Sequence, residues 1–337
     1  MNLALIITTL LVACAVCAAL IVLLRPLLQR YALARPNARS SHRVPTPQGG
    51  GLAVIISAIA AVACAITFSG LTASSSLIVV LVATILLALV GAYDDLRTMP
   101  VLPRLLMQAA AVGMTLGVLP QEFHLLPALP LWAERAVLLI GGLWFVNLVN
   151  FMDGLDWMTA AEVVPVTTAL VLFGIFGELP ISATIVALAL CGAMVGFAPF
   201  NKPIAKLFLG DVGSLPIGLL TGWCLLQLAG SGHLAAALLL PLYYLADATL
   251  TLFRRLIKGE AVWIAHRSHF YQQATDNGFS VIQVVRNVFI LNIVLAAFAA
   301  ITVWLKSPAV QGVMLLLGAG AVANVLYRFS RPRKISG

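Results

Sequence analysis

Three short polar strings flank long apolar segments of this chain, and they hold side chains that could do chemistry. The strings occupy residues 91–95 (GAYDD), 147–154 (NLVNFMDG) and 208–214 (FLGDVGS). Carboxylate and amide oxygens bind divalent cations, and a carboxylate beside another carboxylate can act as a base. A chain with few acids that gathers them in this way is expected to have a functional site there.

The composition indicates that the elements around these strings cross a membrane. Of 337 residues, 61% are hydrophobic and only 9% are charged, too few to cover the surface of a soluble protein. Apolar runs of about 20 residues recur along the chain, and each can cross a hydrocarbon core of about 30 Å as a helix. We predict an all-α, polytopic membrane protein with one domain over residues 1–337 and about eleven transmembrane helices. The predicted spans are residues 3–24, 49–68, 76–93, 103–119, 132–150, 158–176, 181–198, 212–229, 234–253, 283–304 and 309–327.

Basic residues indicate the orientation. An odd number of spans places the termini on opposite sides, and with the N-terminus outside, the cytoplasmic segments hold 18 of the 20 lysines and arginines. This bias follows the positive-inside rule, and it accounts for the net charge of +8 without a nucleic-acid partner. We predict an outside N-terminus, a cytoplasmic C-terminus and all three polar strings on the cytoplasmic face. The predicted cytoplasmic loops are residues 25–48, 94–102, 151–157, 199–211 and 254–282.

The acidic residues of the first and third strings each allow two interpretations. Asp94 and Asp95 end the third predicted span, where they could hold a cation or act as a base, or form a solvated polar stop. Asp211 lies between Gly210 and Gly213 at the start of the eighth span, and the glycines would let a phosphate or a metal ion approach the backbone. An aspartate at that place is also a good N-cap, and the two roles are compatible.

The second string places polar groups on one face of a helix. Asn147, Asn150 and Asp153 recur every third residue, so that they share an arc of roughly 120°. Such a face can bind a nucleotide or complete the ligand shell of a hard metal ion. The alternative is a helix end that packs its polar groups against a neighbouring helix. Asp156 follows on the connecting turn.

The predicted cytoplasmic loops add cations, and the ninth span contains an acid. His266, Arg267 and His269 can donate hydrogen bonds to a diphosphate, or they belong to a solvated loop. Arg43 belongs to a turn rich in proline and glycine, and it is either directed at the membrane edge or a positive-inside anchor. Asp247 lies inside the ninth span, where an acid is either functional or hydrogen-bonded to a neighbouring helix.

Taken in chain order, these motifs resemble the polyprenyl-phosphate N-acetylhexosamine-1-phosphate transferases. The resemblance comprises the turn at residues 43–51, the Asp94–Asp95 pair, residues 147–156, residues 208–214 and the histidine loop at residues 266–269. That family includes the bacterial phospho-N-acetylmuramoyl-pentapeptide translocase and the enzymes that start O-antigen chains. Residues 36–42 and the His-Arg-Ser-His sequence of the histidine loop look most like the O-antigen-initiating branch.

The resemblance implies a reaction at the cytoplasmic face of the bacterial inner membrane. A UDP-N-acetylhexosamine donates its sugar 1-phosphate to undecaprenyl phosphate and UMP leaves, with Mg²⁺ required and Mn²⁺ as an alternative ion. The matching motif positions imply metal ligation by Asp211 and Asp153. They imply catalytic roles for Asp94, Asp95, His266 and His269. They imply substrate binding by Arg43, Asn147, Asn150, Asp153, Asp156 and Arg267.

The chain departs from the translocase pattern at two places. The translocase has three consecutive histidines where this chain has His-Arg-Ser-His, and it has lysine where this chain has Arg43. Both departures favour a simple UDP-N-acetylhexosamine over the large, peptide-bearing donor of the translocase.

A membrane transporter is the rival interpretation. Asp247 and the face with Asn147, Asn150 and Asp153 would then form a path for a cation or a proton. A transport site usually lies near the membrane midplane, whereas these polar groups gather on one face, so the enzyme is favoured. Whether two chains form a homodimer stays open.

Overall fold

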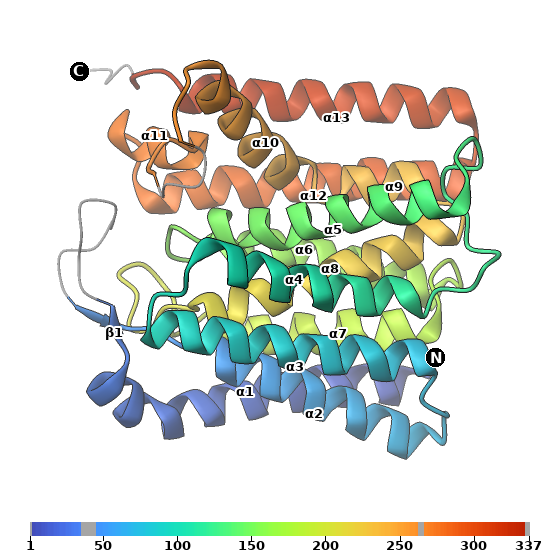
Figure 1. Ribbon diagram of the computed structural model, residues 1–337, viewed down its shortest axis with the longest axis horizontal. Coiled ribbons are helices and arrows are strands. Elements are labelled where there is room, and N and C mark those ends of the chain that lie inside the picture. The colour runs from blue at the N-terminus through green and yellow to red at the C-terminus, as the bar shows by residue number, and fades with distance from the viewer. Residues whose placement is uncertain (1, 35–44, 262–265, 334–337) are drawn as a thin grey trace.

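The computed structural model describes residues 2–34, 45–261 and 266–333, and it is a bundle of helices that lie side by side (Figure 1). Two short strands, β1 (Leu33–Ala34) and β2 (Thr46–Pro47), pair in antiparallel fashion at one end of the bundle. The helices are α1 (Leu3–Tyr31), α2 (Gly51–Ser69), α3 (Ser75–Leu96), α4 (Val101–Gly117), α5 (Leu131–Met152), α6 (Met158–Ile175), α7 (Ile181–Phe197), α8 (Asp211–Gly230), α9 (Leu234–Leu239), α10 (Leu242–Ile257), α11 (Phe270–Asp276), α12 (Val281–Leu305) and α13 (Pro308–Phe329).

Most of these helices are suited to a membrane. Within the described residues, eight are long and apolar enough to cross it, and the 17-residue helices α4 and α7 are also apolar. The prediction of a helical, multi-pass membrane protein is confirmed. The start of α1 and the end of α13 lie at opposite ends of the bundle (Figure 1). The count of eleven spans and the choice of the cytoplasmic end stay predictions.

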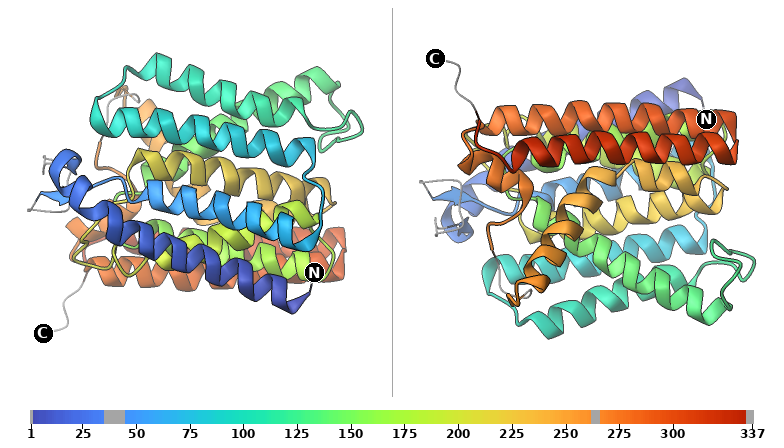
Figure 2. Two further views of the ribbon diagram at one scale, coloured as in Figure 1. Left: turned by 90° about the horizontal axis from the view of Figure 1, so that it is seen from below. Right: turned by 90° about the horizontal axis from the view of Figure 1, so that it is seen from above.

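The ninth predicted span, residues 234–253, is not one continuous helix. Its sequence forms α9, of six residues, and α10, of 16 residues, on either side of Pro241. Proline has no backbone N–H, and its ring clashes with the carbonyl one turn earlier. In consequence α10 leaves the direction of the other helices and crosses them at an angle (Figure 2).

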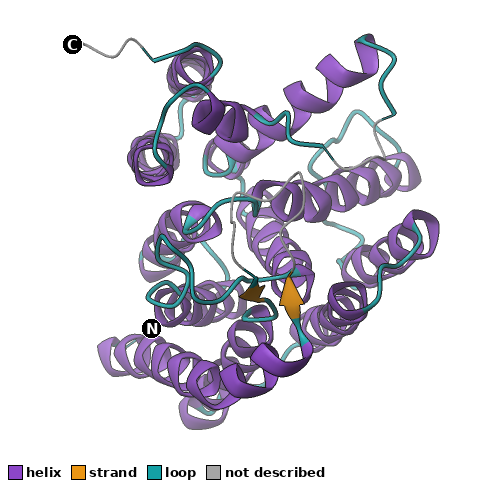
Figure 3. Cartoon of the chain, turned by 90° about the vertical axis from the view of Figure 1, so that its left-hand side faces the viewer, coloured by secondary structure: helices purple, strands orange, loops and turns teal. Residues whose placement is uncertain are grey.

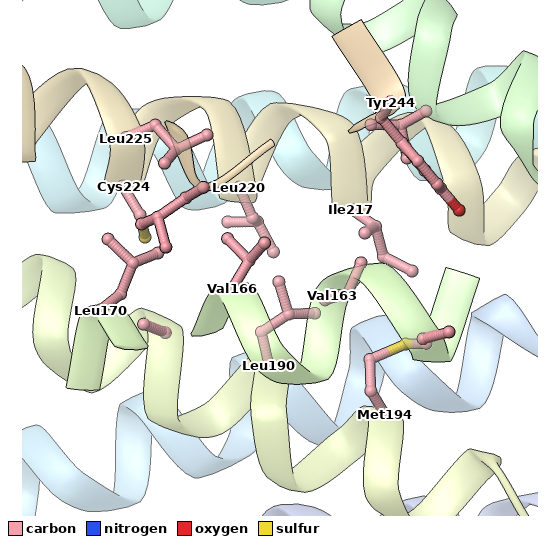
Figure 4. Packing of buried hydrophobic residues seen from close by; sticks show 14 of the residues in the cluster. Val163, Val166, Leu170, Leu190, Met194, Ile217, Leu220, Cys224, Leu225 and Tyr244 are labelled. Carbon is pink, nitrogen blue, oxygen red and sulfur yellow. The ribbon is translucent and has the colours of Figure 1, made fainter. Parts of the chain in front are cut away.

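The interior is packed with apolar side chains and small residues. Side chains from α6, α7 and α8, among them Val166, Leu190 and Leu220, interdigitate between these helices (Figure 4). A Cβ atom at Gly192 or Gly196 would come within 2.5 Å and 2.4 Å of backbone oxygens of α1. Helices in membranes pack closely through such small residues, so α7 lies directly against α1.

The start of α8 is held between α2 and α3 in the same way. A Cβ atom at Gly51 would lie 2.2 Å from the Cα atom of Gly213, and one at Gly91 would lie 2.2 Å from the carbonyl oxygen of Asp211. Next to this contact, the backbone N–H groups of Gly50 and Gly51 donate to the carbonyls of Phe208 and Leu209. These approaches fix the third polar string at the end of the bundle that carries the strands, which faces the viewer in Figure 3.

Candidate active site

The first and third polar strings meet because Asp95 caps α8. Its carboxylate accepts hydrogen bonds from the backbone N–H groups of Asp211, at 2.9 Å, and Val212, at 3.1 Å. The N-cap position is Gly210, which has a φ of 78° and no room for a side chain, since a Cβ atom would lie 2.5 Å from the Asp95 carboxylate. The alternative role of Asp211 as the N-cap of this helix is therefore wrong. Asp95 supplies the capping oxygens, and the Asp211 side chain is left for other partners.

The Asp211 carboxylate contacts the second string and a basic side chain. The Nδ2 atom of Asn150 donates to the Oδ1 atom of Asp211, at 2.8 Å, and to the Ser214 hydroxyl, at 2.8 Å. The Nη1 atom of Arg104 lies 3.8 Å from the Asp211 Oδ2 atom and 3.0 Å from the Asp94 Oδ2 atom. Arg104 therefore bridges two acids that are far apart in the chain.

Hydrogen bonds to both carboxylate oxygens hold the Asp94 side chain in place. The Oδ1 atom accepts a hydrogen bond of 2.6 Å from the backbone N–H of Met99, and the Oδ2 atom pairs with Arg104. Met99 and Arg104 belong to the turn and helix that directly follow α3. From the sequence, Arg104 is one of the basic residues that follow the positive-inside rule. Its place at the start of the helix that follows the acidic pair is the signal that connects it with Asp94.

Asp153 directly follows the last residue of α5 and belongs to the same group of acids. Burial raises the pKa of its carboxyl to about 8; the hydrogen bond from the Thr159 hydroxyl opposes this rise, and the charges of Asp211 and Asp95 add to it. The acids of all three strings are thus close enough to influence one another. Carboxylates this close together repel one another, and a bound cation would offset that repulsion.

Asn147 lies one turn further from this group. Its Nδ2 atom donates to the Oε1 atom of Gln108, at 2.7 Å, and to the carbonyl of Leu143, at 2.8 Å. The side chain is buried between α4 and α5. Of the three residues predicted to share a face, Asn150 and Asp153 join the acidic group, whereas Asn147 connects two helices.

Asp156 ties two of the predicted loops together. Its Oδ2 atom accepts a hydrogen bond of 3.0 Å from the backbone N–H of Ala205, and the Oδ1 atom of Asn201 accepts one of 2.7 Å from the backbone N–H of Trp157. Asp156 also lines a cavity of about 740 Å³, together with Arg25 and Lys206. This cavity has two basic side chains at its wall.

The histidine loop is held by Asp247. The two carboxylate oxygens of this buried residue, which is 0% exposed, accept hydrogen bonds of 3.0 Å from the backbone N–H groups of Phe270 and Tyr271. The Nδ1 atom of His269 lies 3.3 Å from the same carboxylate. Asp247 therefore caps α11, which agrees with the structural alternative for this residue.

The two histidines of the loop stack on each other, with ring centroids 4.8 Å apart. Tyr271 brings them towards the second string, because its hydroxyl donates to the carbonyl of Phe151, at 2.9 Å. Arg267 is directed elsewhere, since its Nη2 atom lies 3.0 Å from the Thr275 hydroxyl and 3.3 Å from the Asp276 carboxylate. Arg43, the remaining predicted site residue, lies outside the described residues.

The donor set fits a magnesium ion in type and charge. Asp94, Asp95, Asp153 and Asp211 are hard oxygen donors of the kind that Mg²⁺ prefers, and Arg104 is the basic side chain that the structure pairs with them. Among the described residues, no three His, Cys, Asp or Glu side chains are already arranged as a metal-binding cluster. The acids meet, but their oxygens are engaged by helix amides, Asn150 and Arg104.

Residues 77–229 match the model of glycosyl transferase family 4, a stretch that contains all three polar strings. Over this stretch the chain is similar to that family. It is similar to the decaprenyl-phosphate N-acetylglucosaminephosphotransferase of Mycobacterium leprae, at 28% identity over 88% of this chain and 84% of the relative. It is also similar to the probable undecaprenyl-phosphate N-acetylglucosaminyl 1-phosphate transferase of Bacillus subtilis, at 24% identity over 85% of this chain and 84% of the relative.

The relatives confirm the resemblance to polyprenyl-phosphate sugar-1-phosphate transferases. The phospho-N-acetylmuramoyl-pentapeptide-transferase of Clostridium beijerinckii is 39% identical, but over only 24% of this chain and 25% of its own length. The family match leaves out residues 43–51 before its start and the histidine loop after its end. The roles of the residues in those two segments stay predictions, as do the roles of the residues in the three polar strings.

Proposed function

We propose that the protein transfers N-acetylhexosamine 1-phosphate from a UDP-amino sugar to undecaprenyl phosphate, releasing UMP. The observation that carries this proposal is the convergence of the acids of all three strings, with Arg104, at one end of a membrane bundle. The names of the relatives, which are polyprenyl-phosphate transferases of N-acetylglucosamine phosphate, support it. The product, a lipid diphosphate sugar, would start O-antigen or related polysaccharide synthesis from the cytoplasmic face of the bacterial inner membrane.

The reaction exchanges one phosphoanhydride for another. An oxygen of the lipid phosphate attacks the phosphorus that carries the sugar, the bond from that phosphorus to the bridging oxygen breaks, and UMP leaves with that oxygen. Both reactants are anions, so catalysis depends on positioning and on neutralising charge. Asp211 and Asp153 would hold Mg²⁺, which supplies that neutralisation when bound.

The residues around the acids have tasks that follow from their contacts. Asp95 keeps the start of α8 in place, and Asn150 orients the Asp211 carboxylate. Asp94 is the acid that would accept a proton from the lipid phosphate or orient it, with Arg104 3.0 Å away. His266 and His269 would contact the phosphates of the donor, in line with their capacity to donate hydrogen bonds.

Two cavities suit the two substrates. The cavity of about 740 Å³ beside Asp156 has the size of a small-molecule site, and Arg25 and Lys206 at its wall suit an anionic nucleotide. A second, apolar cavity of about 350 Å³ lies within the spans and is lined by Trp144, Gly218 and other residues of α4, α5 and α8 to α10. Because α5 and α8 also carry Asn150 and Asp211, a polyprenyl tail in this cavity would lie along the helices that bear the site.

Within the part of the chain that the structure describes, no contact favours the rival transporter. Both oxygens of Asp247, the acid within the ninth predicted span, accept backbone hydrogen bonds from α11, which leaves this group in a structural role. The remaining acids of the polar strings lie at helix ends.

The reversibility of the exchange provides a test that separates the enzyme from a binding protein. Added UMP should release labelled sugar from the lipid product, and Asp94→Asn should slow the forward and reverse directions by the same factor, because a group that acts in the transition state serves both. Label release from preformed lipid diphosphate sugar is the measurement. Glu122→Gln, a change at an exposed carboxylate, is the matched control and should alter neither rate. Label that stays on the lipid at every UMP concentration would contradict the proposal.

A further inference from the structure

A buried acid and a buried amide face each other between α6 and α12. Glu162 is 3% exposed and Asn292 is 1% exposed. The Nδ2 atom of Asn292 donates to the Oε2 atom of Glu162, at 2.7 Å, and to the carbonyl of Ala161, at 3.0 Å. The other oxygen of each side chain, Oε1 of Glu162 and Oδ1 of Asn292, is buried and has no hydrogen-bond partner.

Pro165 explains one of the two hydrogen bonds that Asn292 donates. In an α-helix the carbonyl of Ala161 would accept from the N–H of the residue four positions later, and that residue is Pro165, which has none. The side-chain amide of Asn292 supplies the missing donor. Both amide hydrogens are therefore in use, one at Ala161 and one at Glu162, and only the amide oxygen remains.

One proton on the Glu162 carboxyl would give both unpartnered oxygens a hydrogen bond. An ionised carboxylate at this depth would have one amide donor, and among the described residues no basic side chain pairs with it. The titratable groups that face Glu162 are the phenols of Tyr243 and Tyr244 on α10, which are neutral. If Glu162 carries a proton on Oε1, that O–H can donate to Oδ1 of Asn292, and the pair would then close with two antiparallel hydrogen bonds.

We propose that Glu162 is a neutral carboxylic acid in a reciprocal pair with Asn292, and that this pair positions the first turn of α6. Thr159 lies in that turn, on the helical face that Glu162 occupies one turn later, and its hydroxyl donates to the Asp153 carboxylate. The pair thus fixes α6 to α12 at the place where α6 holds one of the acids. Glu162 is a positioning residue, and the catalytic part of this statement rests on the proposed transfer reaction.

Two variants, Glu162→Gln and Glu162→Ala, distinguish a protonated Glu162 from an ionised one. The amide of the Glu162→Gln variant can donate to Oδ1 of Asn292 and accept from Nδ2, so kcat and the thermal midpoint should stay close to those of the unaltered protein. Glu162→Ala removes both hydrogen bonds and should lower kcat about 10-fold to 100-fold, the usual effect of losing a residue that orients a site group, with a smaller change in KM. A Glu162→Gln variant as impaired as Glu162→Ala would overturn the proposal.

An infrared measurement tests the protonation state without any turnover. The carbonyl band of a protonated carboxylic acid should disappear at neutral pH in Glu162→Gln and persist in Glu122→Gln, the exposed control.

Tyr244→Phe should leave the band in place and unshifted; a shift would mean that the unpartnered Tyr244 hydroxyl, and not Asn292, is the partner of the acid. A spectrum in which Glu162→Gln loses no such band would overturn the proposal. If the band is lost as expected but no sugar is transferred by the unaltered protein, the pair stands and only the proposed reaction fails.

Discussion

Asp211→Asn is expected to leave the bundle folded and to slow transfer at least about a hundredfold, roughly 2.7 kcal/mol of transition-state stabilisation. The start of α8 should survive the change because the cap comes from Asp95, which binds the backbone N–H groups of residues 211 and 212. The new side chain can still accept a hydrogen bond from Asn150. It lacks the negative charge that holds a divalent cation, so the loss should appear in catalysis.

Transfer at limiting Mg²⁺, together with the thermal midpoint in detergent, distinguishes this outcome from a folding defect. Glu122→Gln, which removes an exposed carboxylate, should match the unaltered protein in both measurements. Normal turnover of Asp211→Asn at limiting Mg²⁺ would show that the Asp211 charge has no part in the reaction.

Gly91→Ala is expected to destabilise the protein by about 1–3 kcal/mol, the usual range for inserting a methyl group into a tightly packed site. The new Cβ atom would lie 2.2 Å from the carbonyl oxygen of Asp211, so α3 and α8 have to move apart. That movement also takes Asp95 away from the amides that it caps. Transfer activity should therefore fall together with the thermal midpoint.

Gly113→Ala is the matched control for this change. Gly113 also lies inside a helix, and no heavy atom is within 4 Å of the position that its Cβ atom would take. Alanine favours a helix over glycine by about 1 kcal/mol, so this variant should be as stable as the unaltered protein or more stable. Equal stability and activity of Gly91→Ala and Gly113→Ala would show that the contact between α3 and α8 is unimportant.

Apolar runs were enough to locate the helices, because a segment that crosses lipid must satisfy its own backbone hydrogen bonds. They were not enough to find the break at Pro241, since the apolar composition continues through residues 234–253. The extension of α1 to Tyr31 was also missed, as its last turns carry Arg25 and Arg30 beyond the apolar core. Hydropathy reports where the lipid ends, and a helix can continue past that point.

The chemistry of the site was more predictable than its contacts. The spacing of Asn150 and Asp153 indicated a shared face, and both reach the acidic group. The capping of α8 by Asp95 joins residues 116 positions apart, and no local pattern encodes such a pair. Gly210 and Gly213 were predicted to admit a phosphate or a metal ion; in the structure they give room to Asp95 and to Gly51.

The most direct measurement of the central claim follows labelled sugar from a UDP-amino sugar into lipid. Purified protein would be given undecaprenyl phosphate, Mg²⁺ and a panel of labelled UDP-N-acetylhexosamines. We expect at least one donor to yield a lipid diphosphate sugar and an equal amount of UMP, and a chelator of Mg²⁺ to stop both. Failure of every UDP-N-acetylhexosamine to label the lipid, with Mg²⁺ and the acceptor present, would contradict the assignment as a sugar-phosphate transferase.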